Sequence, residues 1–321
     1  MTTSRGNCNY MSSKLPACSP QCVPSDRETT AWMRAANTKP LGEFYEQIIR
    51  AIYTAILQPG DLAIDCGASH GLHTIPMSDL VGSSGRVLAI EAIPELADGL
   101  ALRAKRNGHT NIEVVPEAIG SREGRATFSL VKGAPGYSGL WLRDDLPSGL
   151  RTSIATIEVT VTTLDGLLAN SRHRVRFVKM DLEGGEYHAL QGAASILKDH
   201  RPLVVFEHGA ERAAKWYGYT RDDWFALFEG ADLAVFDLFG RPLLPEHWGF
   251  NNIPYYCIAA ARGSDDERFV CSDLQDLICT AHGKWRRERF NRVRRLIRPY
   301  SNLRPRFNRV KQWIKQRVRS A

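Results

Sequence analysis

Residues 61–71 read Asp-Leu-Ala-Ile-Asp-Cys-Gly-Ala-Ser-His-Gly, which is a short apolar strand followed by a glycine-rich turn that opens a helix. Such a turn lets a ligand approach the backbone closely, and the N-terminus of the following helix supplies free N–H groups. In open α/β sheets, ligands bind in the crevice at the carboxyl ends of the strands. The stretch therefore predicts a strand, turn and helix at the ligand-binding edge of an α/β sheet.

The alternation of apolar strands and helices continues on both sides of this stretch. Further strands are predicted at 85–91, 112–115, 175–181, 202–207, 233–238 and 255–260, and helices at 41–57, 71–81, 94–107, 186–198 and 220–228. Continuous apolar strands that alternate with helices indicate a mostly parallel sheet covered on both faces. We therefore expect one doubly wound α/β domain over residues 41–262.

Residues 121–163 interrupt this pattern. The segments 125–131 and 156–161 alternate like antiparallel strands around a loop rich in Gly, Pro and Ser. Within that loop, residues 136–141 combine glycines with aromatic side chains, which suits either a surface that stacks on a sugar acceptor or an ordinary exposed hairpin.

Two acidic residues end consecutive strands. Asp65 lies beside the glycine-rich turn, where its charge would repel a phosphate but would suit a ligand with an ammonium or hydroxyl donor. Glu91 ends the second strand, where an acid can accept both hydroxyls of a ribose. An adenosine ligand that carries an amino-acid group satisfies both acids, so we expect S-adenosylmethionine. Glu117 and Ala118, after the third strand, are then expected beside the adenine.

Other interpretations of the same stretch stay open. Each acid taken alone also fits a turn residue or a solvated strand end. NAD binding requires G-x-G-x-x-G, and this sequence lacks the second close glycine. Gly67-Ala68-Ser69-His70-Gly71 also matches the G-x-S-x-G motif of serine hydrolases, for which Asp181 and His208 would complete a triad. That hypothesis leaves Asp65 and Glu91 without a function.

A second cluster of charge follows a later apolar strand. Residues 178–186 read Val-Lys-Met-Asp-Leu-Glu-Gly-Gly-Glu. Because side chains alternate along a strand, Lys179 and Asp181 lie on the same face at its carboxyl end. We expect catalytic roles for Asp181, Lys179 and Glu183, and a plain Lys179–Asp181 ion pair is the structural alternative.

The next strand ends in Glu207-His208-Gly209. Methylation of a hydroxyl requires removal of its proton, and histidine has a suitable pKa. His208, oriented by Asp181 or Glu207, is therefore a candidate base. Carboxylates that hold Mg²⁺ and acidify the hydroxyl are the alternative, and the residues do not decide between the two. We assign no metal ligands.

Several motifs together resemble those of FkbM-family methyltransferases, a branch of the class I methyltransferases. They are Asp-Cys-Gly-Ala-Ser-His-Gly (65–71), Ala-Ile-Glu-Ala-Ile-Pro (89–94), Glu-Ala-Ile-Gly (117–120), Val-Thr-Thr-Leu-Asp (161–165) and residues 178–186. The resemblance covers about residues 41–262. It implies a seven-stranded Rossmann-like fold and O-methyl transfer from S-adenosylmethionine, commonly to hydroxyls of sugars or natural products.

The candidate cofactor-binding residues are Asp65, Gly67, Ser69, Gly71, Glu91, Ala92, Glu117, Ala118 and Asp181. The sequence departs from the family at His70, where a small polar residue is more common. It also departs at 92–94, where the family tends toward Glu-Pro. Neither departure removes a residue to which we assign chemistry.

Charge is distributed unevenly along the chain. Residues 284–321 carry 15 basic residues and one acid, whereas residues 1–283 carry 27 basic and 34 acidic ones. The net charge of +7 therefore does not by itself indicate nucleic-acid binding. The tail combines basic residues with apolar helical faces, which suits an anionic membrane surface or the protein's own acidic body better than nucleic acid.

The two ends of the chain differ from the central domain. Residues 1–40 are predicted to be a poorly ordered leader, and residues 263–321 an acidic linker with a basic amphipathic tail. With no secretory signal, no apolar run of about 18 residues and no disulfide framework among seven cysteines, we expect a cytoplasmic enzyme, peripheral at the inner membrane surface. A binding protein that keeps the crevice without turnover is the non-enzymatic alternative.

Overall fold

The computed structural model describes residues 39–144, 146–249 and 254–278, and the structural statements below refer to these residues. The basic tail (284–321) and the leader up to residue 38 lie outside them. The expected contact of the tail with an anionic membrane therefore stays a prediction. Among the described helices, none combines the length and the apolar character that crossing a bilayer requires.

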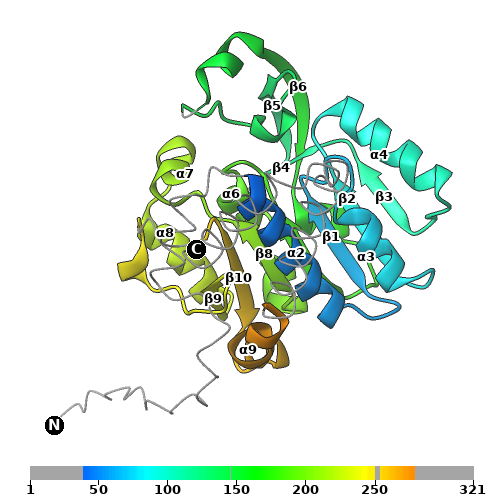
Figure 1. The fold of residues 1–321 in the computed structure, drawn as a ribbon, viewed down its shortest axis with the longest axis vertical. Helices are drawn as coiled ribbons and strands as arrows, with labels where there is room; N and C mark the ends of the chain where they lie inside the picture. The colour runs from blue at the N-terminus through cyan, green and yellow to red at the C-terminus, as the bar shows by residue number, and fades with distance from the viewer. Residues whose placement is uncertain (1–38, 145, 250–253, 279–321) are drawn as a thin grey trace, which may run out of the picture.

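A seven-stranded sheet forms the centre of the structure, with the strand order β3-β2-β1-β7-β8-β10-β9 (Figure 1). The strands are β1 (Leu62–Cys66), β2 (Arg86–Ile90), β3 (Ile112–Val115), β7 (Val175–Met180), β8 (Leu203–Glu207), β9 (Leu233–Asp237) and β10 (Tyr256–Ala261). β10 runs antiparallel to both of its neighbours, and the other pairs are parallel. The predicted α/β fold with a mostly parallel sheet is confirmed.

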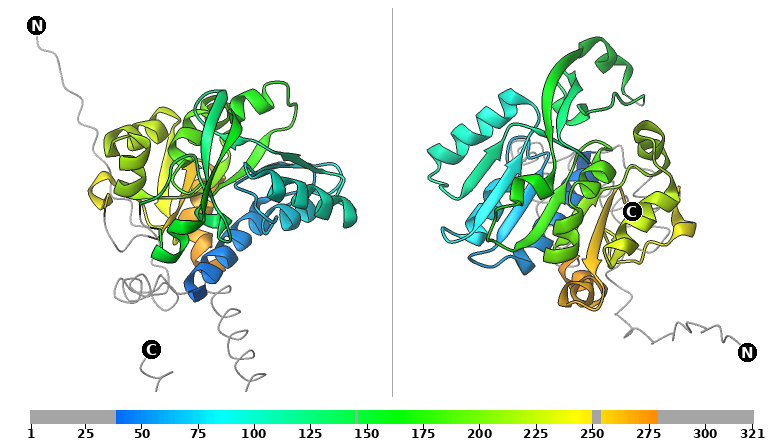
Figure 2. Two further views of the ribbon diagram at one scale, coloured as in Figure 1. Left: turned by 90° about the horizontal axis from the view of Figure 1, so that it is seen from above. Right: turned by 180° about the vertical axis from the view of Figure 1, so that it is seen from behind.

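Helices cover both faces of this sheet because its strands bury side chains alternately on either side. Phe177 of β7 belongs to a hydrophobic cluster with residues of α2, α3 and the segment 269–278, whereas Val178 belongs to one with residues of α5, α6, α7 and α8. Figures 1 and 2 show α2 on one face only. The helices are α2 (Lys39–Ile56), α3 (Thr74–Val81), α4 (Pro94–Arg106), α5 (Leu164–Leu168), α6 (Glu186–Gln191), α7 (Ala210–Tyr217), α8 (Arg221–Gly230) and α9 (Asp265–Arg268).

A second sheet of three strands, in the order β4-β6-β5, stands above the carboxyl edge of the larger one (Figures 1 and 2). β5 (Gly124–Val131) and β6 (Ile154–Thr162) pair antiparallel, as predicted, and β4 (Ala118–Ile119) pairs parallel with β6. The loop that joins β5 to β6 is thereby held over the carboxyl ends of the parallel strands.

The helix predicted over 186–198 is interrupted. α6 ends at Gln191, and a separate π-helical turn, η3, covers Ile196–His200. A Cβ added at Gly192 would lie 2.1 Å from the backbone oxygen of Gly120. The break thus lets the chain after β4 pass close to the end of α6, which a helical periodicity alone does not reveal.

The turn after β1 is fixed by an even closer approach of two backbones. Asp181 N donates a 3.1 Å hydrogen bond to Cys66 O, so the segment after β7 lies directly beside Gly67. A Cβ on Gly67 would lie 2.0 Å from the carbonyl oxygen of Asp181, and its φ is +74°. The close backbone of Asp181 therefore requires glycine at position 67, whether or not a ligand also approaches this turn.

We expect Gly67→Ala to lower the free energy of unfolding by at least about 2 kcal/mol, because it adds overpacking to a left-handed backbone. Gly108→Ala is the matched control, since Gly108 has φ +77° but nothing within 4 Å of an added Cβ. Gly108→Ala should lower the free energy of unfolding by only about 1 kcal/mol. Urea unfolding of both variants measures the difference, and equal losses would contradict the steric argument.

Candidate functional site

A cavity of about 220 Å³ opens at the carboxyl ends of β1, β2 and β7. The strand order reverses at β1 and β7, which is where open α/β sheets bind ligands. The lining comes from the turn after β1, the end of β2, residues 117–119, the loop 135–140, residues 181–185 and α7. Segments far apart in the sequence therefore form one site.

Glu91 and Ser69 meet at this cavity, as their positions at consecutive strand ends predict. Glu91 is 6% exposed and accepts hydrogen bonds from Ser69 N (2.8 Å) and Ile93 N (2.9 Å). Burial raises the pKa of Glu91, and the two backbone donors act in the opposite direction. Each carboxylate oxygen retains a lone pair, so the side chain can also accept from a ligand.

Asp65 is more deeply buried than the sequence suggests and does not belong to the cavity lining. Thr74 Oγ1 donates a 2.6 Å hydrogen bond to Oδ2 of Asp65, whereas Oδ1 accepts none. Lys179 Nζ lies 3.8 Å from Oδ1. A buried carboxylate oxygen without a donor is costly, which fits a group that completes its hydrogen bonds through a bound ligand or water.

The other candidate cofactor residues divide into two groups. Gly67, Ala92, Glu117 and Ala118 line the cavity with Glu91. Gly71 does not, and a Cβ there would lie 2.5 Å from Leu100 Cδ1, so this glycine permits packing of α4 rather than ligand approach.

Sequence reasoning missed part of the cavity wall. Phe128 of β5, Ser138 and Leu140 of the following loop, and Tyr217 of α7 all line it. The glycine and aromatic pattern of residues 136–141 is the one sequence signal that pointed to this wall, and Tyr217 lies on a helix that the sequence did not reveal.

A buried charge network lies beneath the cavity. Asp65 and Lys179 are paired positions of β1 and β7, which places their side chains on the same face. Lys179 Nζ lies 3.4 Å from Asp181 Oδ2, and Tyr256 Oη donates a 2.7 Å hydrogen bond to the same oxygen. Lys179 is buried outside the cavity lining, so the predicted Lys179–Asp181 ion pair is present, and Tyr256 joins it from β10.

The network fixes the charge of its members. Burial opposes ionisation of Asp181, but Lys179 and the Tyr256 hydroxyl outweigh it and hold the pKa of Asp181 below its usual value. Burial likewise opposes the Lys179 ammonium, yet Asp181 and Asp65 raise the pKa of Lys179 above its usual value. Asp181 is therefore an anion and Lys179 a cation at neutral pH.

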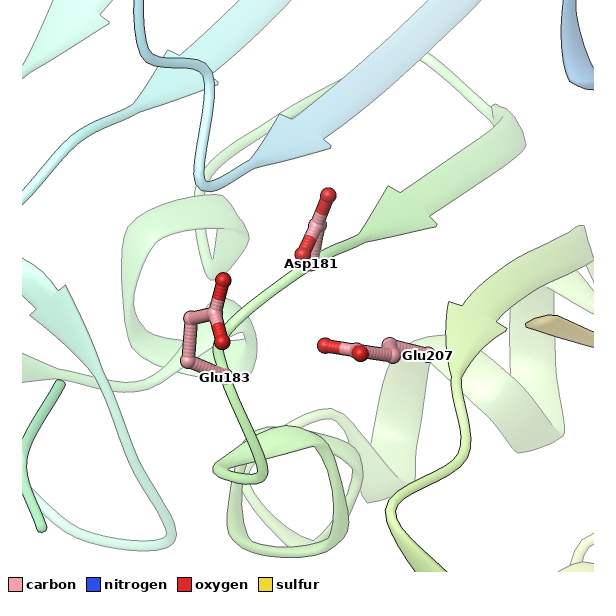
Figure 3. A group of neighbouring side chains, drawn as sticks. All are labelled: Asp181, Glu183 and Glu207. Carbon is pink, nitrogen blue, oxygen red and sulfur yellow. The ribbon is translucent and has the colours of Figure 1, made fainter. Parts of the chain in front are cut away.

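Asp181, Glu183 and Glu207 form a carboxylate triad whose oxygens lie within 4.8 Å of one another (Figure 3). Asp181 and Glu183 follow β7, and Glu207 ends the neighbouring strand β8. Arg143 from the β5–β6 connection pairs with Glu183. Burial, and then Asp181, raise the pKa of Glu183 to about 8, while Arg143 opposes them. The triad offers oxygen ligands of the kind Mg²⁺ takes, but Lys179, Tyr256 and Arg143 already neutralise or hydrogen-bond two of its members.

Glu207 differs from the other two acids of the triad. Burial, Glu183 and Asp181 raise the pKa of Glu207 well above its usual value. Its Oε2 is buried and has no hydrogen-bond partner among the described residues. Ionisation of Glu207 is therefore opposed by the two acids that follow β7.

His208 lies apart from this triad. Its ring contacts Trp224 at 4.8 Å and Trp248 at 5.1 Å between centroids, and neither ring nitrogen has a hydrogen-bond partner in the described structure. Burial lowers the pKa of His208 to about 4. The expected orientation by Asp181 or Glu207 is not found, because adjacent residues at a strand end point to opposite faces. A serine hydrolase triad with Ser69 would also need a contact from His208, and neither ring nitrogen of His208 makes one in the described structure.

Residues 65–242 match the model of the methyltransferase FkbM domain. The chain belongs to the FkbM methyltransferase family. Residues 65–242 therefore form a methyltransferase domain, and the cavity at the strand reversal is its candidate active site.

The FkbM-family chain is also similar to curated methyltransferases. A protein-L-isoaspartate O-methyltransferase of Methanococcus aeolicus is 30% identical over 118 residues, which are 34% of this chain and 55% of that protein. The corresponding protein of Ignicoccus hospitalis is 39% identical over 64 residues, 20% of this chain and 30% of that protein. The chain thus spans about half or less of the length of these relatives.

Solved structures resemble it more loosely. The methyltransferase FkbM from Methylobacillus flagellatus has 18% identity and a TM-score of 0.39, with 65% of this chain and 49% of that chain covered. Fibrillarin of Aeropyrum pernix, solved with S-adenosylmethionine, has 13% identity and a TM-score of 0.38. The match covers 68% of this chain and 76% of the fibrillarin chain.

The buried network predicts a large effect for Lys179→Met. The side chains of Lys179 and Asp65 are 5% and 1% exposed, so removal of the ammonium leaves buried carboxylates without their counter-charge. We expect the FkbM-family domain to lose about 3–5 kcal/mol of unfolding free energy, measured in urea. Arg221→Met, which removes a pair whose side chains are 48% and 79% exposed, should cost less than about 1 kcal/mol. Similar losses in both variants would refute a buried role for Lys179.

Proposed function

We propose that this methyltransferase transfers its methyl group to a hydroxyl of a sugar, glycan or natural-product acceptor. The observation that carries the proposal is the carboxylate triad Asp181, Glu183 and Glu207, two members of which line the cavity. Acids at this position can take the proton that leaves a hydroxyl as it is methylated. They would repel an acceptor that is itself a carboxylate, so the triad favours a neutral acceptor.

For the cofactor we propose roles that follow the cavity from β2 to β7. Glu91 accepts the ribose hydroxyls, the 117–118 segment borders the adenine, and Asp65 attracts the ammonium of the amino-acid group through the turn at Gly67. Bound S-adenosylmethionine supplies an electrophilic methyl group. The unsatisfied Oδ1 of Asp65 and the free lone pairs of Glu91 support this arrangement.

The wall above the cavity suits a sugar acceptor. Tyr137 and Trp141 of the β5–β6 connection are 38% and 53% exposed, although both are large aromatic residues. The Trp141 ring lies 6.4 Å from that of Tyr217, which lines the cavity. Exposed aromatic rings next to a polar cavity offer the flat apolar faces on which sugar rings can stack.

The proposed ribose contact predicts that Glu91→Gln weakens S-adenosylmethionine binding by about 10- to 100-fold, the value of a hydrogen bond to a charged group. Isothermal titration calorimetry on the full chain measures the dissociation constant. Glu95→Gln, one turn away on the exposed side of α4, is the matched control and should bind as the unaltered protein does. Unchanged binding in Glu91→Gln would remove Glu91 from the cofactor site.

The acceptor class predicts the chemistry of the product. A methylated hydroxyl is an ether that survives mild alkali, whereas a methylated isoaspartyl carboxylate is an ester that releases methanol. Incubation of the full chain with methyl-labelled S-adenosylmethionine and fractionated extract should give alkali-stable label. An isoaspartyl peptide offered as acceptor should remain unlabelled, and alkali-labile label on that peptide would overturn the hydroxyl proposal.

A further inference from the structure

We propose that Glu183 is the general base of the transfer and that Glu207 acts through it as a positioning residue that shares the proton. This inference rests on the proposed methylation of a hydroxyl and deepens it. It replaces His208, whose ring is enclosed by tryptophans and has no polar contact in the described structure.

Glu183 lies in a sharp turn of the backbone at the edge of the cavity. Its φ of +54° lies in the left-handed region, which non-glycine residues seldom adopt, and Gly184 follows at φ +104°. Such strain persists where the surrounding structure demands it and is concentrated at functional sites. Glu183 lines the cavity together with Asp181, and its carboxylate is held by Arg143. The side chain is thus placed against the space where an acceptor binds.

The charged surroundings of Glu183 distinguish it from Asp181. Burial is the largest cause that sets the pKa of Glu183 near 8; Asp181 after β7 and Glu186 of α6 raise it further, and Arg143 of the β5–β6 connection lowers it. Asp181 is held as an anion by Lys179 and is a weak base. A carboxylate with a pKa close to the working pH accepts a proton far more effectively.

Glu207 and Tyr217 are the remaining titratable groups that face Glu183. Burial and Glu186 raise the pKa of the Tyr217 hydroxyl, so it stays neutral. Burial and the neighbouring acids oppose ionisation of Glu207 and raise its pKa well above the usual value. Glu207 Oε2 has no hydrogen-bond partner in the described structure, and its carboxyl group lies within 4.8 Å of that of Glu183, so a small side-chain movement would let the two groups share one proton.

The proposed step is balanced in atoms and charge. The acceptor oxygen forms a bond to the methyl carbon as the carbon–sulfur bond breaks, and the sulfur keeps that electron pair. The O–H bond of the acceptor breaks, and its proton passes to the Glu183 carboxylate. The products are the methyl ether, S-adenosylhomocysteine and a protonated Glu183, which returns its proton to solvent or shares it with Glu207.

Glu183→Gln tests the base directly. We expect kcat to fall by about 10²- to 10⁴-fold, the usual contribution of a general base, while the dissociation constant of S-adenosylmethionine changes less than about threefold. For the full chain, kcat/KM should rise with pH through about 8, because the base must be ionised, and this rise should vanish in the variant. Glu229→Gln on the exposed side of α8 is the control. Turnover that persists in Glu183→Gln with the same pH profile would overturn the assignment.

The Glu207 variants separate a proton-sharing acid from a metal ligand. Glu207→Leu should lower kcat about tenfold. Glu207→Gln keeps a neutral hydrogen-bond donor, so its kcat should stay close to that of the unaltered chain. Activity should also survive treatment with EDTA. Loss of activity in EDTA that Mg²⁺ restores, with Gln as damaging as Leu, would overturn the proposal and identify the triad as a metal site.

A further measurement does not depend on turnover. Carbon-13 resonances of labelled glutamate carboxyls, assigned by their loss in Glu183→Gln and Glu207→Gln, report both titrations in the full chain. We expect Glu183 to titrate near pH 8 and the pKa of Glu207 to lie well above its usual value. Titration of Glu183 below pH 6 would overturn the assignment even if no acceptor is methylated. If the unaltered chain gives no alkali-stable product while Glu183 titrates near 8, the proposed hydroxyl acceptor alone fails.

Discussion

The buried ammonium of Lys179 between Asp65 and Asp181 is the interaction on which the rest of the site depends. It joins β1 to β7 at the point where the strand order reverses, so it lies where any cofactor must bind. A buried charge without a partner is strongly destabilising, and one cation that serves two carboxylates avoids this cost on both strands. Asp65 thereby has a counter-charge 3.8 Å away although its Oδ1 accepts no hydrogen bond.

The same arrangement divides the acids at the cavity into two kinds. Lys179 lies beside Asp65 and Asp181, whereas Glu183, Glu186 and Glu207 lie at buried or partly buried positions next to other acids. The pKa values of these three glutamates are raised in consequence. Neighbouring carboxyl groups with separated pKa values are the usual means by which one fold performs both electrostatic stabilisation and proton transfer. The fold thus lowers the pKa of Asp181 and raises the pKa values of Glu183 and Glu207, although the three carboxyl groups lie close together.

The sequence predicts that Gly67 and Glu91 come together at one cavity, because both follow the ends of neighbouring parallel strands. Asp65, Gly67 and Glu91 are each recognisable from a local pattern, and parallel strands bring their carboxyl ends to one edge. The expected contact of His208 with Asp181 or Glu207 is absent among the described residues, since the alternation that places Lys179 and Asp181 on one face also separates Glu207 from its neighbour. Tyr256 reaches Asp181 across 75 residues of sequence, and no local pattern contains that contact.

The acceptor side is harder to predict for a physical reason. Phe128 comes from β5, Arg143 from the β5–β6 connection and Tyr217 from α7, so their positions depend on how distant segments pack. The close approach of Gly192 to Gly120 shows how strongly that packing is constrained, since any side chain at Gly192 would collide with the backbone after β4. A family can therefore keep its cofactor motifs while the inserted sheet and α7 change. The motifs from which we expect the methyl donor are local patterns, whereas the wall proposed for the acceptor is set by tertiary contacts.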